Sequence, residues 1–294
     1  MKFGILGDLH LRSTKPINRI DDFYYAQFNK LQQAFTVFEQ HGCHAILQPG
    51  DFFNNYGNDS YELLFDVICF LKKQTIPIYC VLGQHDVRFH NLEIKNTPIQ
   101  ILNEMGLVHI INEVKALSNN VFIYGKSWGE AIPKIAFNNN KTNILLTHLM
   151  VIKNKKVWEG QKEYSTTKFM KKRGFHFCIC GDNHNAFIDG GVINCGSLTR
   201  MSIDQMDHTP LYGIIDTDSL SLNMKHYDIA PSSDVFCQDV VEEKREKIKE
   251  NSFVANLNAD FAGEVSYRDN INYFLKQKRQ RKRVKEIIEE SLIS

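Results

Sequence analysis

Five short segments of the sequence place Asp, His or an amide side chain directly after an apolar run. They are Gly7-Asp8-Leu9-His10, Pro49-Gly50-Asp51, Gly83-Gln84-His85-Asp86, Thr147-His148 and Gly181-Asp182-Asn183-His184. In an extended segment, both side chains of an Asp-x-His pair point to one face, and both are good ligands for a divalent metal ion. An isolated Asp at a strand end is usually a turn residue or a helix cap. Five recurrences favour metal binding, because a buried Asp or His must be paired or metal-bound to offset its lost hydration.

The elements that must position these side chains are short buried strands. Continuous apolar runs predict strands over residues 1–6, 45–48, 76–82, 121–125, 143–147, 175–180 and 191–194. In α/β sheets, ligand sites gather at the carboxyl ends of the strands, so residues far apart in sequence can converge there. The five segments are therefore expected to meet in space.

Helical patterns separate these strands. Within residues 22–40, apolar side chains recur at spacings of three and four, and Gly42 follows as a stop signal. A second helix is expected over residues 60–73. A third begins at Thr97-Pro98, with proline at the first helical position, and ends at Gly106. The first 210 residues thus predict an α/β domain with buried sheets.

The hydrophobic pattern and the charge composition of the sequence change after about residue 210. Residues 211–216 and 220–227 predict a pair of strands, interpreted as a small β cap over residues 211–238. Residues 239–294 are charged and favour helix, so they are interpreted as a helical C-terminal tail. Seven basic residues and no acid lie between Lys276 and Lys285, and an apolar stripe follows in residues 284–292. The basic run is either a solvated helix face or a contact to DNA phosphates, and the stripe suits a partner or the parent domain.

Bulk composition sets limits on partners. The 294 residues carry 35 Lys and Arg against 34 Asp and Glu, a net charge of +1, so any contact with nucleic acid must depend on local patches. No apolar run approaches the roughly 18 to 20 residues of a membrane helix. The first residues are too short and polar for a signal peptide, and the seven cysteines lie mostly in apolar runs, which indicates reduced thiols. A cytoplasmic protein is expected.

The five segments together resemble the calcineurin-like metallophosphoesterases, whose pattern is DxH, GD, GNH(D/E), a lone H and GHxH. The resemblance spans roughly residues 1–200 and implies a two-sheet sandwich flanked by helices. A narrower likeness lies in residues 194–202, which resemble the segment after the last metal motif of SbcD-type nucleases, particularly their short phage relatives. That likeness implies a manganese-dependent (or magnesium-dependent) DNA nuclease subunit that works with a coiled-coil ATPase of the SbcC type. It also implies a bacterial or phage-infected cell as the source.

The resemblance also implies a role for each ligand. One metal would be held by Asp8, His10 and His184, the second by Gln84, His148 and Asp182, and Asp51 would bridge the two. A bridging carboxylate offsets the repulsion between dications roughly 3.5 to 4 Å apart, and the pair then clamps a phosphate and activates a water.

Four further residues are predicted to take part in the reaction. His85 would lie near the leaving group as a general acid or charge stabiliser, and Asp86 beside it could orient its imidazole. Arg88 and Arg200 are candidate contacts to substrate phosphate, because a guanidinium matches phosphate as a planar fork. The alternative for each arginine is a solvated loop position.

The sequence departs from the family pattern at two positions. Gln84 stands where Asn is usual, and Asp182 replaces the first His of GHxH. Both changes fall on the second metal, and a carboxylate ligand favours manganese or magnesium over zinc. We therefore expect a weaker second site.

The function predicted from the sequence is hydrolysis of DNA phosphodiester bonds, with DNA and an ATPase subunit as partners and a homodimer left open. One alternative is a phosphatase or small-molecule phosphodiesterase, because the same cluster serves many esters. Another is a weakly catalytic subunit that binds DNA ends or the ATPase, for which Gln84 and Asp182 are the supporting features.

Overall fold

The computed structural model describes residues 1–57, 60–93, 95–153, 164–237, 239–243 and 245–246. The chain divides into two compact units, Met1–Cys237 and Gln238–Ser294. In the second unit, residues 239–243 and 245–246 are helical. The basic run at 276–285 and the apolar stripe at 284–292, both part of the predicted tail, lie outside the described residues.

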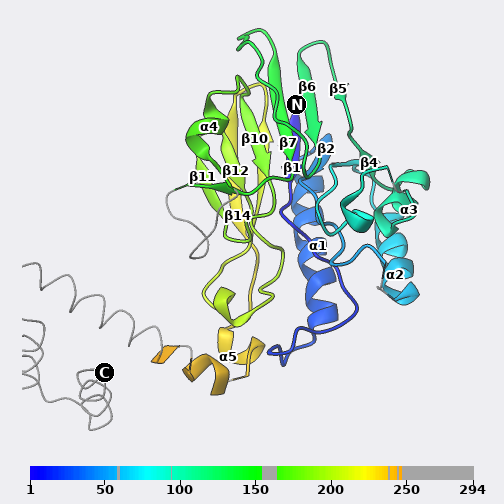
Figure 1. The fold of residues 1–294 in the computed structure, drawn as a ribbon, viewed down its shortest axis with the longest axis vertical. Coiled ribbons are helices and arrows are strands. Elements are labelled where there is room, and N and C mark those ends of the chain that lie inside the picture. The colour runs from blue at the N-terminus through cyan, green and yellow to red at the C-terminus, as the bar shows by residue number, and fades with distance from the viewer. Residues whose placement is uncertain (58–59, 94, 154–163, 238, 244, 247–294) are drawn as a thin grey trace, which may run out of the picture. The chain divides into compact units, whose positions relative to one another are not determined.

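The first unit is built on two six-stranded sheets (Figure 1). The first sheet has the order β14-β13-β1-β2-β3-β4, formed by Ser221–His226, Leu211–Asp216, Lys2–Ile5, Ala45–Gln48, Ile78–Cys80 and His109–Ile110. The second has the order β11-β12-β10-β7-β6-β5, formed by Phe187–Asp189, Val192–Asn194, Phe177–Cys180, Thr142–Thr147, Val121–Lys126 and Val114–Ala116. The seven strands predicted from apolar runs are all present.

Parallel strands form the centre of each sheet. β1, β2, β3 and β4 run parallel in the first sheet, as do β6, β7, β10 and β12 in the second. The outer strands β5, β11, β13 and β14 are antiparallel to their neighbours. Two short strands, β8 (Val151–Ile152) and β9 (Ser165–Thr166), pair separately. The carboxyl ends of the central strands in each sheet therefore share an edge.

The layers follow from the alternation of side chains along the buried strands. In β2, Ile46 packs toward the helices whereas Leu47 packs between the sheets. In β10, Ile179 packs between the sheets whereas Cys178 packs on the outer face. Both faces of these strands are covered, as their continuous apolar sequences require.

Helices cover the outer face of each sheet (Figure 1). Helices α1 (Phe23–Gln40), α2 (Tyr61–Leu71) and α3 (Pro98–Glu104) cover the first sheet, and α4 (Thr167–Lys171) covers the second. Asp22 caps α1 by accepting from the N–H of Tyr25, and Ser60 caps α2. The short helices η1 (Arg88–His90), η2 (Ile203–Gln205) and α5 (Ser232–Val235) lie in the connecting segments. This confirms the predicted sandwich flanked by helices.

The strand pair assigned from sequence to a small cap lies within the first sheet. β13 pairs antiparallel with β1 along its length, from Lys2 opposite Asp216 to Ile5 opposite Gly213, and β14 pairs with β13. A separate β cap over residues 211–238 was therefore a wrong interpretation. Strand periodicity shows that a strand exists but not which partner accepts its hydrogen bonds.

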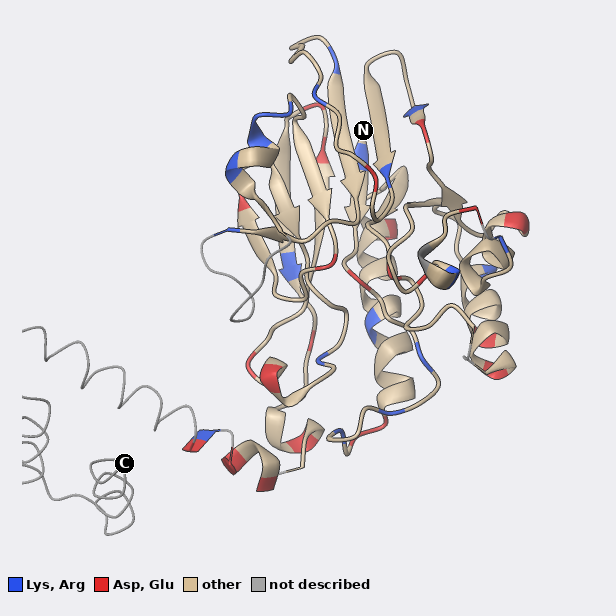
Figure 2. Cartoon of the chain, in the orientation of Figure 1, with Lys and Arg blue, Asp and Glu red and all other residues tan. Residues whose placement is uncertain are grey.

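The placement of charged residues and cysteines agrees with two expectations from the sequence, namely balanced charge and reduced thiols. Lys and Arg are interspersed with Asp and Glu over the described elements (Figure 2). All seven cysteines are free thiols. The part of the chain that the structure describes contains no helix both long and apolar enough to span a bilayer.

Candidate metal centre

The five predicted segments follow directly on five parallel strands. Asp8 and His10 lie beyond β1, Asp51 beyond β2, Gln84 and His85 beyond β3, His148 beyond β7, and Asp182 and His184 beyond β10. β1, β2 and β3 are neighbours in one sheet, and β7 and β10 are neighbours in the other. The ligands thus come from the same edge of both sheets, as the topology predicts.

The first metal group consists of Asp8, His10 and His184. One ligand atom from each lies within 4.8 Å of the other two. The Nε2 atoms of His10 and His184 are 2.9 Å apart, and Nε2 of His184 is 4.0 Å from Oδ2 of Asp8. Two imidazole nitrogens at this distance need a proton or a cation between them, because two lone pairs would repel. The structure therefore brings the three predicted ligands of the first site together.

The second metal group predicted from the sequence consists of Gln84, His148 and Asp182, whereas the second group of His and Asp ligand atoms within 4.8 Å of one another is His10, Asp51 and His85. The Gln84 amide donates to Oδ1 of Asp182 at 2.9 Å. Asp51 lies between the groups: its Oδ2 is 3.5 Å from Nε2 of His10 and 3.4 Å from Nε2 of His148. This is the place that a bridging carboxylate requires.

Unpartnered buried atoms test whether this cluster fits metal ions. Seven buried side-chain polar atoms of the described residues have no hydrogen-bond partner, and five belong to predicted ligands: Asp8 Oδ1, His10 Nδ1, Asp51 Oδ2, Gln84 Oε1 and His148 Nε2. Native interiors contain few such atoms, because each costs free energy. Their concentration among oxygen and imidazole ligands fits two dications.

The pKa shifts of the clustered side chains also fit bound metal ions. Burial raises the pKa of Asp8 well above its ordinary value, and burial lowers the pKa of His10 to about 3. Burial also disfavours the charged forms of Asp51 and His148, but their mutual attraction outweighs it. The pKa of Asp51 is lowered and that of His148 is raised to about 10. Without other cations, Asp51 thus relies on a protonated His148.

Backbone strain is concentrated at the ligands. His10, Asp51 and Asp182 have φ angles of 45°, 52° and 73°, in the left-handed region that costs energy for residues other than glycine. The backbones also approach one another closely. A Cβ on Gly83 would lie 2.1 Å from Oδ1 of Asp51, and one on Gly181 would lie 2.5 Å from Oδ1 of Asp8. Glycine precedes Gln84 and Asp182 because no side chain fits at either position.

His85 lies at the solvent side of the cluster. Its ring stands edge-on to that of His10, with centroids 5.0 Å apart, and its backbone N–H donates to Oδ1 of Asp51 at 2.9 Å. Its Nδ1 is 2.8 Å from the carbonyl oxygen of Asn54. A carbonyl only accepts, so Nδ1 carries the proton and Nε2 is left for substrate.

Asp86 does not have the predicted contact with the His85 ring. Its buried carboxylate accepts from the backbone N–H groups of Phe52, Phe53 and Gly83 at 3.0 to 3.2 Å. Burial and the nearby charge of Asp51 raise the pKa of Asp86 to about 7. Asp86 joins the loop after β2 to the loop after β3, while Asn54, which the sequence did not single out, orients His85.

The two predicted phosphate-binding arginines differ. Arg88 is exposed and lies over the ring of Phe89, at 5.0 Å from its centroid. Arg200 is 5 % exposed and donates to the carbonyls of Met206 and Ala230 and to the hydroxyl of Ser232. The Arg200 side chain therefore holds neighbouring loops together, and only a small part of it is exposed.

The segment that resembled SbcD-type nucleases supports the metal loops. Asn194 donates to the carbonyls of Asn183 and Asn185, on either side of His184. Gly196 accepts from the N–H of Asp8, and the N–H of Leu198 donates back to the Asp8 carbonyl. Residues 194–198 therefore have a structural role: they hold the loops that carry Asp8 and His184.

The fold and this cluster define a metal-dependent hydrolase of the α/β class. The model of the calcineurin-like phosphoesterase family matches residues 1–186, so the chain belongs to that family, which uses a two-metal site. Among curated proteins, no sequence matches the chain.

Solved structures also resemble the chain at low sequence identity. A novel archaeal phosphodiesterase is 16% identical, with a TM-score of 0.41, over 77% of this chain and 100% of its own. A dimetal phosphatase from Danio rerio is 12% identical, with a TM-score of 0.47, over 77% of this chain and 95% of its own.

Proposed function

We propose that this protein is a metal-dependent nuclease that hydrolyses phosphodiester bonds in DNA, as the nuclease subunit of a complex with a coiled-coil ATPase. The observation that supports the hydrolytic activity is the convergence on Asp51 of buried ligand atoms that have no hydrogen-bond partner. The DNA part is supported by the likeness of residues 194–202 to SbcD-type nucleases.

The residues divide between holding metal and moving protons. Asp8, His10 and His184 would hold one ion, Gln84, His148 and Asp182 the other, and Asp51 both. Two such ions supply a clamp for the phosphoryl oxygens and an activated water. Manganese or magnesium suits the three carboxylates and the amide better than zinc.

His85 is proposed to serve the leaving oxygen. The Asn54 carbonyl holds its Nδ1–H, so Nε2 is positioned to give a proton to that oxygen or to hydrogen-bond to it. His85 and His184 are partly exposed, whereas Asp8 and Asp51 are fully buried. A phosphodiester would therefore approach from the side of His85 and His184.

The alternative of a phosphatase or small-molecule phosphodiesterase shares this machinery. The test is incubation of the purified protein with labelled linear duplex and single-stranded DNA in manganese, magnesium or EDTA, beside a generic aryl phosphodiester. Metal-dependent cleavage of DNA supports the nuclease. Turnover of the aryl ester without DNA cleavage would favour the alternative, and DNA binding without either reaction would favour a weakly catalytic binding subunit.

A further inference from the structure

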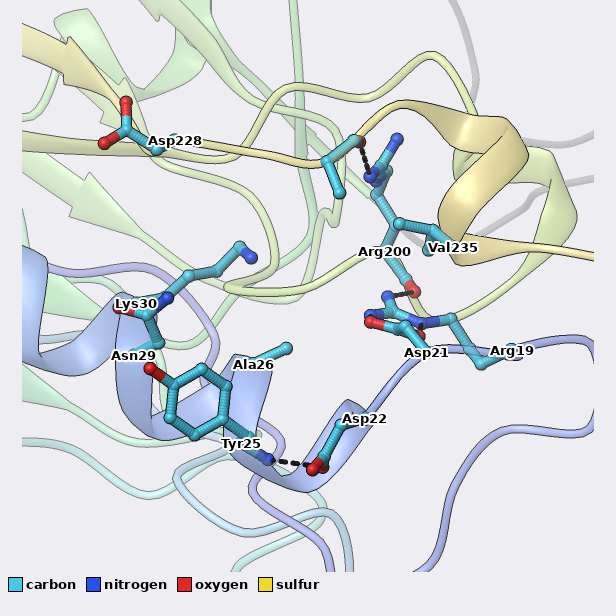
Figure 3. A pocket seen from close by; sticks show the side chains of 11 residues that line it. Arg19, Asp21, Asp22, Tyr25, Ala26, Asn29, Lys30, Arg200, Asp228 and Val235 are labelled. Atoms are coloured by element: carbon cyan, nitrogen blue, oxygen red, sulfur yellow. Dashed lines mark hydrogen bonds and ion pairs between the residues drawn. The ribbon is translucent and has the colours of Figure 1, made fainter.

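A second site lies in a pocket of about 240 Å³ at the start of α1, lined by three basic residues (Figure 3). We call it the basic pocket. Arg19 lies just before α1, Lys30 lies on α1, and Arg200 lies in the segment after β12. Its remaining lining includes Asp21, Asp22, Tyr25, Asn29, Asp228 and Val235.

The charge of Arg19 is matched within the pocket. Its guanidinium makes two hydrogen bonds to Asp21, at 2.8 and 2.6 Å, and donates to the carbonyl of Arg200 at 2.6 Å. The ring of Phe236 lies 5.7 Å from the Arg19 guanidinium and 5.8 Å from that of Arg200. The Asp22 carboxylate also has a partner, because it caps α1 by accepting a hydrogen bond from the N–H of Tyr25. Two of the three carboxylates in the lining are thus committed.

Among the described residues, Arg200 and Lys30 have no ion pair of this kind, although the Asp21 carboxylate lies near both and the Asp207 carboxylate lies near Arg200. The hydrogen-bond acceptors of Arg200 are two carbonyls and one hydroxyl, all neutral, although its side chain is almost fully buried. Lys30 points into the pocket, and none of the described residues forms a hydrogen bond or ion pair with its ammonium group. Burial and the charges of Arg19 and Arg200 lower the pKa of Lys30 to about 8. Asp228, at the exposed rim, is the remaining carboxylate.

The basic pocket and the metal centre lie at the same edge of the first sheet. Helix α1 ends at Gln40, shortly before β2 begins at Ala45, so the start of α1 lies toward the ends of the strands (Figure 1). Arg200 follows closely on Ser197, which bridges to Asp8. An extended substrate held at the metals can therefore reach the pocket.

We infer that the basic pocket binds a phosphate group of the polynucleotide substrate other than the one that is cleaved. A phosphate would supply the anion that Arg200 and Lys30 lack, and Asn29 and Tyr25 could donate further hydrogen bonds to it. This inference rests on the proposed function. It assigns the pocket a role in holding chain-length substrates that a small phosphodiester cannot use.

Chemical protection of Lys30 tests occupancy without activity. The full chain in EDTA is treated at pH 8 with an amine-acylating reagent, and modification of each lysine is measured by mass spectrometry. A single-stranded oligonucleotide should slow modification of Lys30 several-fold and leave Lys72, at the end of α2, unchanged. Equal modification of Lys30 with and without the oligonucleotide would overturn the inference. Protection by inorganic phosphate but not by the oligonucleotide would overturn it too, because it indicates a small-anion site.

Lys30→Met and the control Lys72→Met separate this inference from the proposed function. Lys30→Met should weaken oligonucleotide binding several-fold and reduce the salt slope of log K by about 0.7, the contribution of one phosphate in single strands. Turnover of the aryl phosphodiester should match wild type in both variants. If the wild-type protein cleaves DNA, and Lys30→Met binds DNA with the same affinity and the same salt slope of log K, the phosphate-binding role of the basic pocket is wrong and the proposed function stands. If wild type neither binds nor cleaves polynucleotides, the proposed function fails.

Discussion

The two metal groups are built differently, although both depend on Asp51. In the first group, His10 and His184 bring their Nε2 atoms to 2.9 Å, a contact that needs a cation or proton between them. In the second group, the Gln84 amide already donates to Asp182, so part of the group satisfies itself. The first site therefore depends more on a bound ion. An ion at the second group must compete with the hydrogen bond between Gln84 and Asp182. The geometry therefore agrees with the expectation, drawn from Gln84 and Asp182 in the sequence, that the second metal binds more weakly.

Asp51→Asn is expected to have the largest effect, because it removes the one carboxylate shared by both groups. Hydrolysis of an aryl phosphodiester in manganese should fall roughly 10³-fold, the loss of several kcal/mol of transition-state stabilisation. Asp189→Asn, a surface carboxylate paired with Lys171, is the matched control and should keep full activity. Activity that survives Asp51→Asn would show that the two groups do not share a ligand.

His85→Ala should reduce turnover by about 10²-fold while both metal groups still bind metal. A general acid matters more for a poor leaving group, so the loss should be larger for a nucleotide substrate than for a nitrophenyl ester. The measurement is kcat for both substrates beside metal titration. An equal loss on both, together with weaker metal binding, would indicate that His85 is a ligand.

Metal titration by calorimetry addresses the two groups themselves. Manganese added to the EDTA-treated and dialysed protein should bind in two steps, with the second about tenfold weaker or more. Asp182→Asn should further weaken the second step and leave the first in place, since Asp182 belongs to the second group. Two equally tight sites in the wild-type protein would remove the distinction between the groups.

Asp86→Asn should act mainly on stability. The amide cannot accept all three backbone N–H groups that the carboxylate accepts, so we expect a loss of about 1 to 3 kcal/mol in the free energy of unfolding. Thermal unfolding measures it, with Asp189→Asn again as control. A full loss of activity with unchanged stability would return Asp86 to the catalytic role predicted from sequence.

The convergence of the candidate metal ligands was predictable because their sequence signal is local. Each follows an apolar run that ends at the strand edge, and parallel pairing brings such ends together whatever the intervening helices. The same reasoning located all seven predicted strands. The left-handed backbone at His10 and Asp182 had no comparable sequence signal, because strain of this kind depends on loops from both sheets.

The errors concern partners that are distant in sequence. Asp86 follows His85 directly, yet its carboxylate turns to backbone N–H groups of the loop after β2. β13 pairs with β1, about two hundred residues away. In each case, adjacency in sequence was a poor guide to contact in space.

Side chains from Asp8 to His184 are proposed to hold two cations, one on each side of Asp51. Anomalous diffraction from crystals soaked in manganese would locate these ions. We expect two peaks roughly 3.5 to 4 Å apart, one on each side of the Asp51 carboxylate. Crystals without manganese peaks among these ligands, or with a single peak remote from Asp51, would contradict this proposal.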